Sequence, residues 1–217
     1  IEPNIGRVAV PDDRLNILGK IGKSEKIIPS FMDFVDIAGL VKGASEGEGL
    51  GNKFLGHIRE VDAIAHVVRC FEDNNITHVS SKIDPISDIE TINLELRLAD
   101  LESLNNKREN LEKKLKTNDK DIKIQYDIIQ NILVKFNKEE NIILEQFEEN
   151  EIKFIKTLNL ICLKPTMYVC NVDEDSIHNG NVLSSKVEEL AKKNNQSTVL
   201  VSASIEAQIS GLDNENE

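Results

Sequence analysis

Short apolar runs divide the chain, and we predict that they form strands. Four of them have the pattern of buried strands, at residues 31–35, 63–69, 166–170 and 198–202, and a weaker run lies at 7–10. Helical patterns lie between several of these runs, at residues 52–60 and 181–193. Runs that are largely apolar on both faces suit a parallel sheet covered by helices. The alternation of strand and helix therefore predicts an α/β doubly wound fold with a mostly parallel sheet.

The region 89–160 has a different pattern, rich in Leu, Ile, Glu, Lys and Asn and without Gly or Pro. One apolar stripe at helical spacing comprises Leu94, Leu98, Leu101, Leu104, Leu111 and Leu115. A second stripe comprises Ile128, Ile129, Ile132, Leu133 and Phe136, after a polar break at 116–121. We predict two long helices in an antiparallel hairpin, inserted into the α/β domain as a coiled-coil arm. A pair of ordinary surface helices is the alternative.

Composition limits the kinds of function. The 217 residues are 40% hydrophobic but only 4% aromatic, which is enough for one sizeable core built from aliphatic side chains. The net charge of −12 gives no general attraction to a nucleic-acid backbone. Contact with RNA would need a local basic patch or residues outside this chain, and direct DNA binding is not indicated.

Cysteine use and hydropathy indicate a cytoplasmic protein. Cys70, Cys162 and Cys170 form no CxxC pair, and each lies in or near an apolar run. An odd number of cysteines without metal-ligand spacing favours reduced core thiols. No apolar stretch approaches the roughly 20 residues that a membrane span needs, and no signal-peptide pattern opens the chain.

The main chemical signal is the end of the predicted strand 31–35. Asp36 follows this strand, and Gly39 lies three positions further on. In P-loop hydrolases an Asp at this place holds Mg²⁺, usually through water, and the Gly backbone N–H faces the γ-phosphate, where a side chain would obstruct approach. The glycine-rich loop 40–54 could reorder around a ligand, with a plain flexible loop as the alternative.

A second polar group follows the strand 166–170. Open α/β sheets bind ligands at the carboxyl ends of their strands, and here that end carries Asn171, Val172 and Glu174. Many GTPases have Asn-Lys-x-Asp at this place, and its Asp reads the guanine N1 and amino groups. This chain has Asn-x-x-Glu without the Lys, which weakens a strict guanine preference and makes ATP plausible. A simple Asn-rich turn is the alternative.

The end of the last predicted strand supports the same interpretation. It carries Ser202, Ala203 and Ser204, where GTPases often have Ser-Ala-Lys in backbone contact with the base. The sequence Gly22-Lys23-Ser24, by contrast, only resembles a phosphate-binding loop. That loop requires Gly five positions before its Gly-Lys, and this position holds Ile17.

These residues together resemble the Obg-like ATPase (YchF) family of translation-factor-related P-loop NTPases. Residues 1–12 are similar to its first switch region and 34–54 to its second, and 66–73 and 83–93 are also typical. The match covers almost the whole chain. It implies a nucleotide-binding domain at 1–88 and 161–217, with the coiled-coil insertion at 89–160.

The resemblance also implies roles for single residues. Asp36 would be the Mg²⁺-associated carboxylate, Gly39 the γ-phosphate sensor, and His78 a histidine used in hydrolysis unless it is an ordinary surface histidine. Leu40 stands where many GTPases carry a water-orienting Gln, so that task would fall elsewhere. The residues implied at the base are Asn171, Val172 and Glu174 beside adenine, and Ser202, Ala203 and Ser204 closing over it.

Family members carry a C-terminal TGS domain and associate with ribosomes. The family's phosphate-binding loop, its Mg²⁺-ligating Ser and a switch Thr are absent from these residues, so we expect the chain to be a fragment without its own phosphate site. The leading expectation is a nucleotide-dependent switch that hydrolyses ATP, or GTP, with Mg²⁺ in the full-length protein. The alternatives are a GTPase and a non-enzymatic scaffold that docks a partner through its helical arm.

Overall fold

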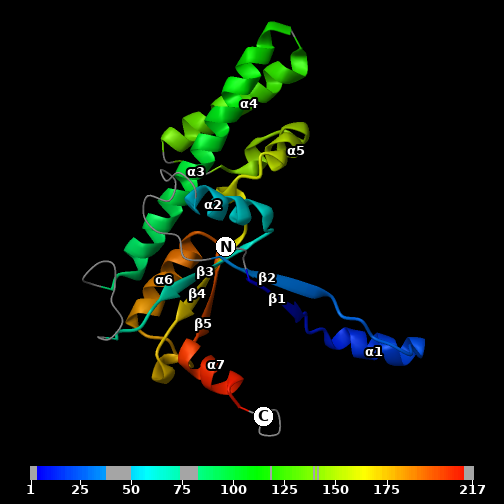
Figure 1. The fold of residues 1–217 in the computed structure, drawn as a ribbon, viewed down its shortest axis with the longest axis vertical. Helices are drawn as coiled ribbons and strands as arrows, with labels where there is room; N and C mark the ends of the chain where they lie inside the picture. The colour runs from blue at the N-terminus through cyan, green and yellow to red at the C-terminus, as the bar shows by residue number, and fades with distance from the viewer. Residues whose placement is uncertain are drawn as a thin grey trace. The chain divides into compact units, whose positions relative to one another are not determined.

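The computed structural model describes residues 4–37, 50–73, 83–117, 119–138, 140 and 142–212. The chain divides into two compact units, Ile1–Leu40 and Val41–Glu217. The ribbon in Figure 1 shows the elements of both units.

The first unit is built on an antiparallel strand pair. β1 (Asn4–Ala9) pairs with β2 (Phe31–Asp36) in a two-stranded sheet, and α1 (Asp13–Gly22) lies between them in the sequence. Arg7 and Asp33 face each other in this register and form an exposed ion pair at 2.6 Å. The prediction that residues 31–35 join the parallel sheet is therefore wrong for the described residues. An apolar run indicates a strand, but it does not specify the direction of its partner.

The second unit contains the predicted parallel sheet. Its strand order is β3 (Ile64–Arg69), β4 (Thr166–Asn171) and β5 (Ser197–Val201), and both pairings are parallel. The connection from β4 to β5 contains α6 (Val182–Lys193), which the sequence predicted. Asn181 caps this helix by accepting hydrogen bonds from the Leu183 and Ser184 backbone N–H groups.

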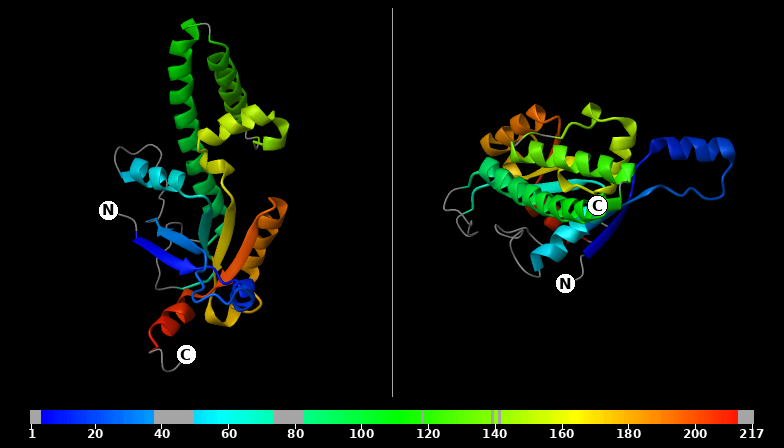
Figure 2. Two further views of the ribbon diagram at one scale, coloured as in Figure 1. Left: turned by 90° about the vertical axis from the view of Figure 1, so that its right-hand side faces the viewer. Right: turned by 90° about the horizontal axis from the view of Figure 1, so that it is seen from above.

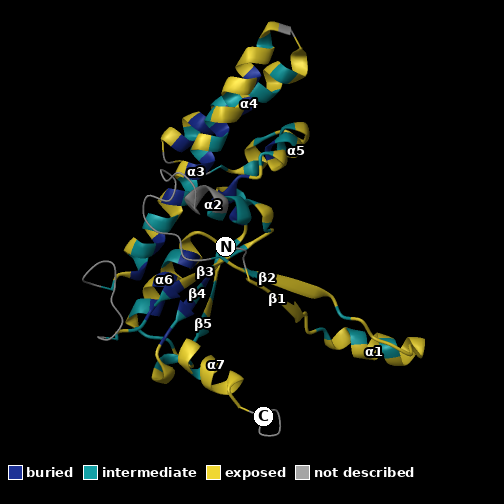
Figure 3. Cartoon of the chain, in the orientation of Figure 1, coloured by how far each residue is buried: buried dark blue, intermediate teal, exposed yellow. Residues whose placement is uncertain are grey.

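One face of the parallel sheet forms an apolar core with α3 (Pro85–Lys114) and α6. This core contains Val68, Cys70, Ile89, Tyr168, Cys170, Val172, Val187 and Ala191. Alternate strand residues point to the opposite face, where Val67 is 65% exposed and Met167 and Val199 are each 39% exposed. Figure 3 shows this contrast between the buried residues of α6 and the exposed positions along β3.

Two long helices follow β3, as predicted. α3 passes through a short 3-10 turn (Leu115–Thr117) and is followed by α4 (Lys120–Asn137), which runs beside it in both views of Figure 2. Their core includes Leu104 and Leu111 of α3 and the whole predicted stripe of α4. Leu94 and Leu98 are exposed, however, so the predicted apolar stripe is wrong in the N-terminal half of α3. There α3 buries Glu95, Ala99 and Asp100 instead, because this part of the helix faces other elements.

The chain returns to the sheet through shorter elements. A 3-10 turn (Leu144–Gln146), α5 (Glu149–Thr157) and a second 3-10 turn (Ile161–Leu163) lead into β4. Ile155 and Leu160 complete the core of the helical pair. All three cysteines are free; Cys70 and Cys170 are buried as predicted, whereas Cys162 is exposed. Among the described residues, no helix is both long and apolar enough to cross a membrane.

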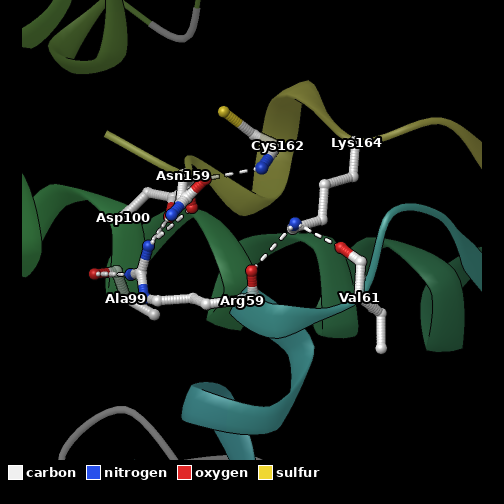
Figure 4. A network of polar contacts seen from close by, with 7 residues as sticks. All are labelled: Arg59, Val61, Ala99, Asp100, Asn159, Cys162 and Lys164. Atoms are coloured by element: carbon white, nitrogen blue, oxygen red, sulfur yellow. Dashed lines mark hydrogen bonds and ion pairs between the residues drawn. The ribbon is translucent and has the colours of Figure 1, made fainter. Parts of the chain in front are cut away.

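A buried ion pair joins α2 (Leu50–Glu60) to the middle of α3. Arg59 Nη1 lies 2.8 Å from Asp100 Oδ1, and the Asp100 side chain is fully buried. The second carboxylate oxygen accepts a hydrogen bond from the Cys162 backbone N–H at 2.9 Å. Arg59 also donates to the Ala99 and Asn159 carbonyls, as Figure 4 shows. Lys164 donates to the carbonyls of Arg59 and Val61 at the end of α2.

Candidate functional site

The carboxyl ends of β4 and β5 lie side by side. Asn171, the last residue of β4, is opposite Val201, the last residue of β5, and the Val172 N–H donates to the Val201 carbonyl at 2.9 Å. The Asn171 side-chain oxygen accepts a hydrogen bond from the Ala203 N–H at 3.0 Å. The two sequence signals that follow these strands therefore meet at one edge of the sheet, where ligands bind in open α/β folds.

Glu174 reaches from β4 toward the same place. It begins a 3-10 turn (Glu174–Ser176), and its carboxylate accepts hydrogen bonds from the hydroxyl of Ser204 and, at 3.0 Å, from Gln208 Nε2. Ser204 and Gln208 are one turn apart on α7 (Ala203–Ser210). Glu174 and Ser204 were predicted from the sequence, whereas Gln208 was not. The contact of Gln208 with Glu174 has no local sequence signal, because it forms only where α7 lies beside the end of β4.

The loop after β4 is held by a second set of hydrogen bonds. Asp173 caps the 3-10 turn by accepting from the Ser176 N–H at 2.9 Å, and Asn181 Nδ2 lies 3.4 Å from its other oxygen. The hydrogen bonds with Ser176, followed by that with Asn181, hold the pKa of Asp173 below its usual value. Asn181 Nδ2 also donates to the Cys70 carbonyl at 2.7 Å, which ties this loop to the end of β3.

Two of the predicted residues are buried at this edge. The Val172 side chain belongs to the sheet core, so only its backbone could border a ligand. Ser202 is 1% exposed, and its hydroxyl is without a hydrogen-bond partner in the described part of the chain. A buried hydroxyl without a partner is unfavourable, so a ligand group or a water molecule that reaches it would stabilise this position.

The remaining predicted residues belong to other parts of the chain. Asp36 ends β2 in the first unit, opposite Asn4, and is exposed. Its carboxylate is the kind of oxygen donor that Mg²⁺ prefers, and it fits a metal that is shared with phosphate and water. Gly39, Leu40 and His78 lie outside the described residues. No group of three or more His, Cys, Asp or Glu side chains gathers as a metal site among the residues that the structure describes.

The Gly22-Lys23-Ser24 sequence lies at the wrong end of a helix for phosphate. Gly22 is the last residue of α1, and Lys23 caps it in the left-handed conformation, with its N–H directed to the carbonyls of Gly19 and Lys20. A helix carboxyl end presents carbonyl oxygens and partial negative charge. This geometry agrees with the sequence prediction that these three residues are not a phosphate-binding loop.

Comparison with known proteins identifies the family. Residues 12–124, just over half of the chain, match the family of 50S ribosome-binding GTPases. Over all 217 residues the chain is 49% identical to the "Ribosome-binding ATPase YchF" of Haemophilus influenzae, and over 219 aligned positions it is 48% identical to that of Bacillus subtilis. In both cases it covers 60% of the relative's length.

A solved structure extends this likeness to the fold. The YchF GTPase of Schizosaccharomyces pombe is 32% identical to the chain and matches it with a TM-score of 0.79. The match covers all of this chain and 60% of that protein. The chain therefore has the α/β fold of P-loop GTPases; it belongs to the family of 50S ribosome-binding GTPases and, within it, to the YchF group.

Proposed function

We propose that the protein containing this chain is a nucleotide-dependent switch that hydrolyses ATP and associates with ribosomes. The observation that carries the proposal is the meeting of Asn171, Glu174 and Ala203 at the carboxyl edge of β4 and β5. Polar side chains and backbone groups converge there, and Glu174 replaces the guanine-reading Asp of GTPases. The relatives named as ribosome-binding ATPases support the substrate and the partner.

Each remaining predicted residue has a role in this proposal. The base lies against Asn171, the Val172 backbone and Ala203, and the Ser202 hydroxyl and Ser204 close the site. Asp36 would hold Mg²⁺ through water, and the bound metal would neutralise charge on the phosphates. The Gly39 N–H contacts the γ-phosphate. His78 orients the attacking water, because the apolar Leu40 side chain cannot.

The helical region has a separate role in this proposal. We assign residues 89–160 to a coiled-coil arm inserted between two parts of a cytoplasmic nucleotide-binding domain, 1–88 and 161–217. The joined core of α3, α4 and α5 supports this assignment because it is separate from the sheet core. Docking through this arm without any nucleotide chemistry is the competing function.

A pair of aspartates on β2 tests the hydrolytic role. In a full-length protein, Asp36→Asn should lower ATP turnover with Mg²⁺ roughly 100-fold, because the metal loses its carboxylate partner. Asp33→Asn is the matched control: it removes the same charge from the same strand, where Asp33 pairs with Arg7, and turnover should stay within about twofold.

Phosphate release from ATP and from GTP, measured side by side, decides between the candidates. Equal turnover of the wild-type and Asp36→Asn proteins would contradict the assigned role of Asp36. Turnover of GTP alone would favour the GTPase, and binding of neither nucleotide would favour the scaffold. We expect no turnover by the 217 residues alone, since they contain no phosphate-binding loop of the GxxxxGK[ST] type.

A further inference from the structure

The Glu174 carboxylate is held against α7 by two donors. Its Oε1 atom accepts hydrogen bonds from Ser204 Oγ and Gln208 Nε2, and Gln208 Nε2 also lies 3.3 Å from Ser204 Oγ. The three side chains therefore form a closed set, which we call the α7 clasp. All three side chains are exposed, so a ligand at this edge of the sheet can reach them.

The position of this carboxylate matters for the choice of base. Guanine presents two neighbouring donors, N1–H and the 2-amino group, and a carboxylate reads both only when both of its oxygens face the base. In the α7 clasp, Oε1 already accepts two hydrogen bonds. Glu174 would have to give up both bonds to present its two oxygens to guanine.

Adenine requires the opposite orientation of Glu174, with its carboxylate turned away from the base. Its N1 is an acceptor, and a carboxylate turned toward it would repel that lone pair. A Glu174 side chain held on α7 avoids this repulsion and leaves the Asn171 amide and the backbone near Ala203 to contact the base. A site whose polar groups match one base discriminates strongly against the other.

We propose that Gln208, together with Ser204, is a positioning residue for base specificity: the α7 clasp holds Glu174 away from the base edge and so favours adenine over guanine. The inference rests on the proposed function, because it requires a nucleotide base at Asn171 and Ala203. In this arrangement Gln208 acts on the base only through Glu174.

The affinities of the full-length protein for Mg²⁺-ADP and Mg²⁺-GDP, measured by calorimetry, test the proposal. Gln208→Ala removes one donor to a charged acceptor and should lower the ratio of the GDP to the ADP dissociation constant about tenfold. Ser204→Ala removes the other donor to Glu174 and should lower the same ratio. Gln208→Lys keeps a donor at this position and should preserve the wild-type ratio.

Ser210→Ala is the matched control. Ser210 is exposed on the same helix, and its hydroxyl donates to the Ala207 carbonyl, away from Glu174, so the ratio should not change. If Gln208→Ala and Ser204→Ala weaken both nucleotides equally, or leave the ratio within twofold of wild type, the α7 clasp does not set specificity. A wild-type protein that binds neither nucleotide would overturn the proposed function as well, and the two failures are thereby distinguished.

Discussion

His66 is the residue whose surroundings most directly predict a response to pH. It lies on the covered face of β3, with its ring centroid 5.6 Å from that of Tyr168. Burial lowers the pKa of His66 below its ordinary value of 6.5, and the charge of Asp88 opposes this shift in part. The imidazole is therefore harder to protonate in the folded protein than in the unfolded chain.

This lowered pKa makes the folded protein less stable as the pH falls. Between the lowered folded pKa and about 6.5, the unfolded chain binds the proton and the folded protein does not. The contribution of His66 to stability is thus fully present above about pH 6.5 and declines as the pH falls below it. We predict that the free energy of unfolding drops between pH 7.5 and pH 5.5, and that His66→Phe removes part of this drop.

Urea unfolding of the wild-type and His66→Phe proteins at several pH values measures how far the free energy of unfolding drops in each. His178→Phe is the control, because His178 is exposed and its replacement should retain the wild-type pH dependence. Parallel curves for the wild-type and His66→Phe proteins would show that another group is responsible. Carboxylates also titrate near the lower end of this range, so the difference between the proteins, rather than either curve alone, carries the result.

At the scale of elements, the Arg59–Asp100 pair attaches α2 to α3. Asp100 is fully buried, so removal of its carboxylate leaves a partly buried guanidinium without its charged partner. We predict that Asp100→Ala lowers the free energy of unfolding by about 3–5 kcal/mol. Hydrogen exchange should increase in α2 in the same variant, because Arg59 of that helix is bonded to Asp100 and the Ala99 carbonyl of α3.

A double variant separates the charge from the packing. Arg59→Met with Asp100→Leu replaces both charges by apolar groups, and it should cost less than Asp100→Ala alone. Glu188→Ala, which removes one partner of an exposed pair with Lys192, should change stability by no more than about 1 kcal/mol. Equal costs for Asp100→Ala and Glu188→Ala would mean that the buried pair does not fix α2.

A helix or strand can be predicted from the sequence when its signal lies within its own residues. β3, β4, β5 and α6 are apolar runs or capped periodic helices, and the structure contains all four near their predicted bounds. α1 and α7 were missed, because a helix of 8 or 10 residues gives little periodicity, and α7 begins without a side-chain cap. The pairing of β1 with β2 was missed because strand direction is a tertiary property.

The residues of the candidate site also divide into those that a sequence rule could place and those that it could not. The positions of Asn171 and Glu174 follow from the rule that ligands gather at the carboxyl ends of parallel strands, which applies to any such sheet. Gln208 could not be found in this way. It meets Glu174 only because the end of β5 brings α7 beside the end of β4, and no local pattern reports a contact between residues 34 positions apart.

At the scale of the whole molecule, the face of the parallel sheet that lies opposite its apolar core is the most informative feature. Val67, Val169 and Val199 form a row across β3, β4 and β5, and the first of them is 65% exposed. Strands that are apolar on both faces are typical of sheets with helices on both sides. The curated relatives are longer than this chain, which covers 60% of their length.

These facts predict that Val67 is buried in a protein of the relatives' length but not in the 217 residues alone. Val67→Thr keeps the side-chain shape and β-branching but replaces one methyl group by a hydroxyl. In the longer protein the hydroxyl would be buried without a designed partner and should lower the free energy of unfolding by about 1–3 kcal/mol. In the 217-residue chain the hydroxyl meets water, and the change should stay within about 0.5 kcal/mol. Denaturant unfolding of both lengths, with and without the substitution, measures the four values. Equal effects in the two lengths would show that residues beyond this chain do not cover this face of the sheet.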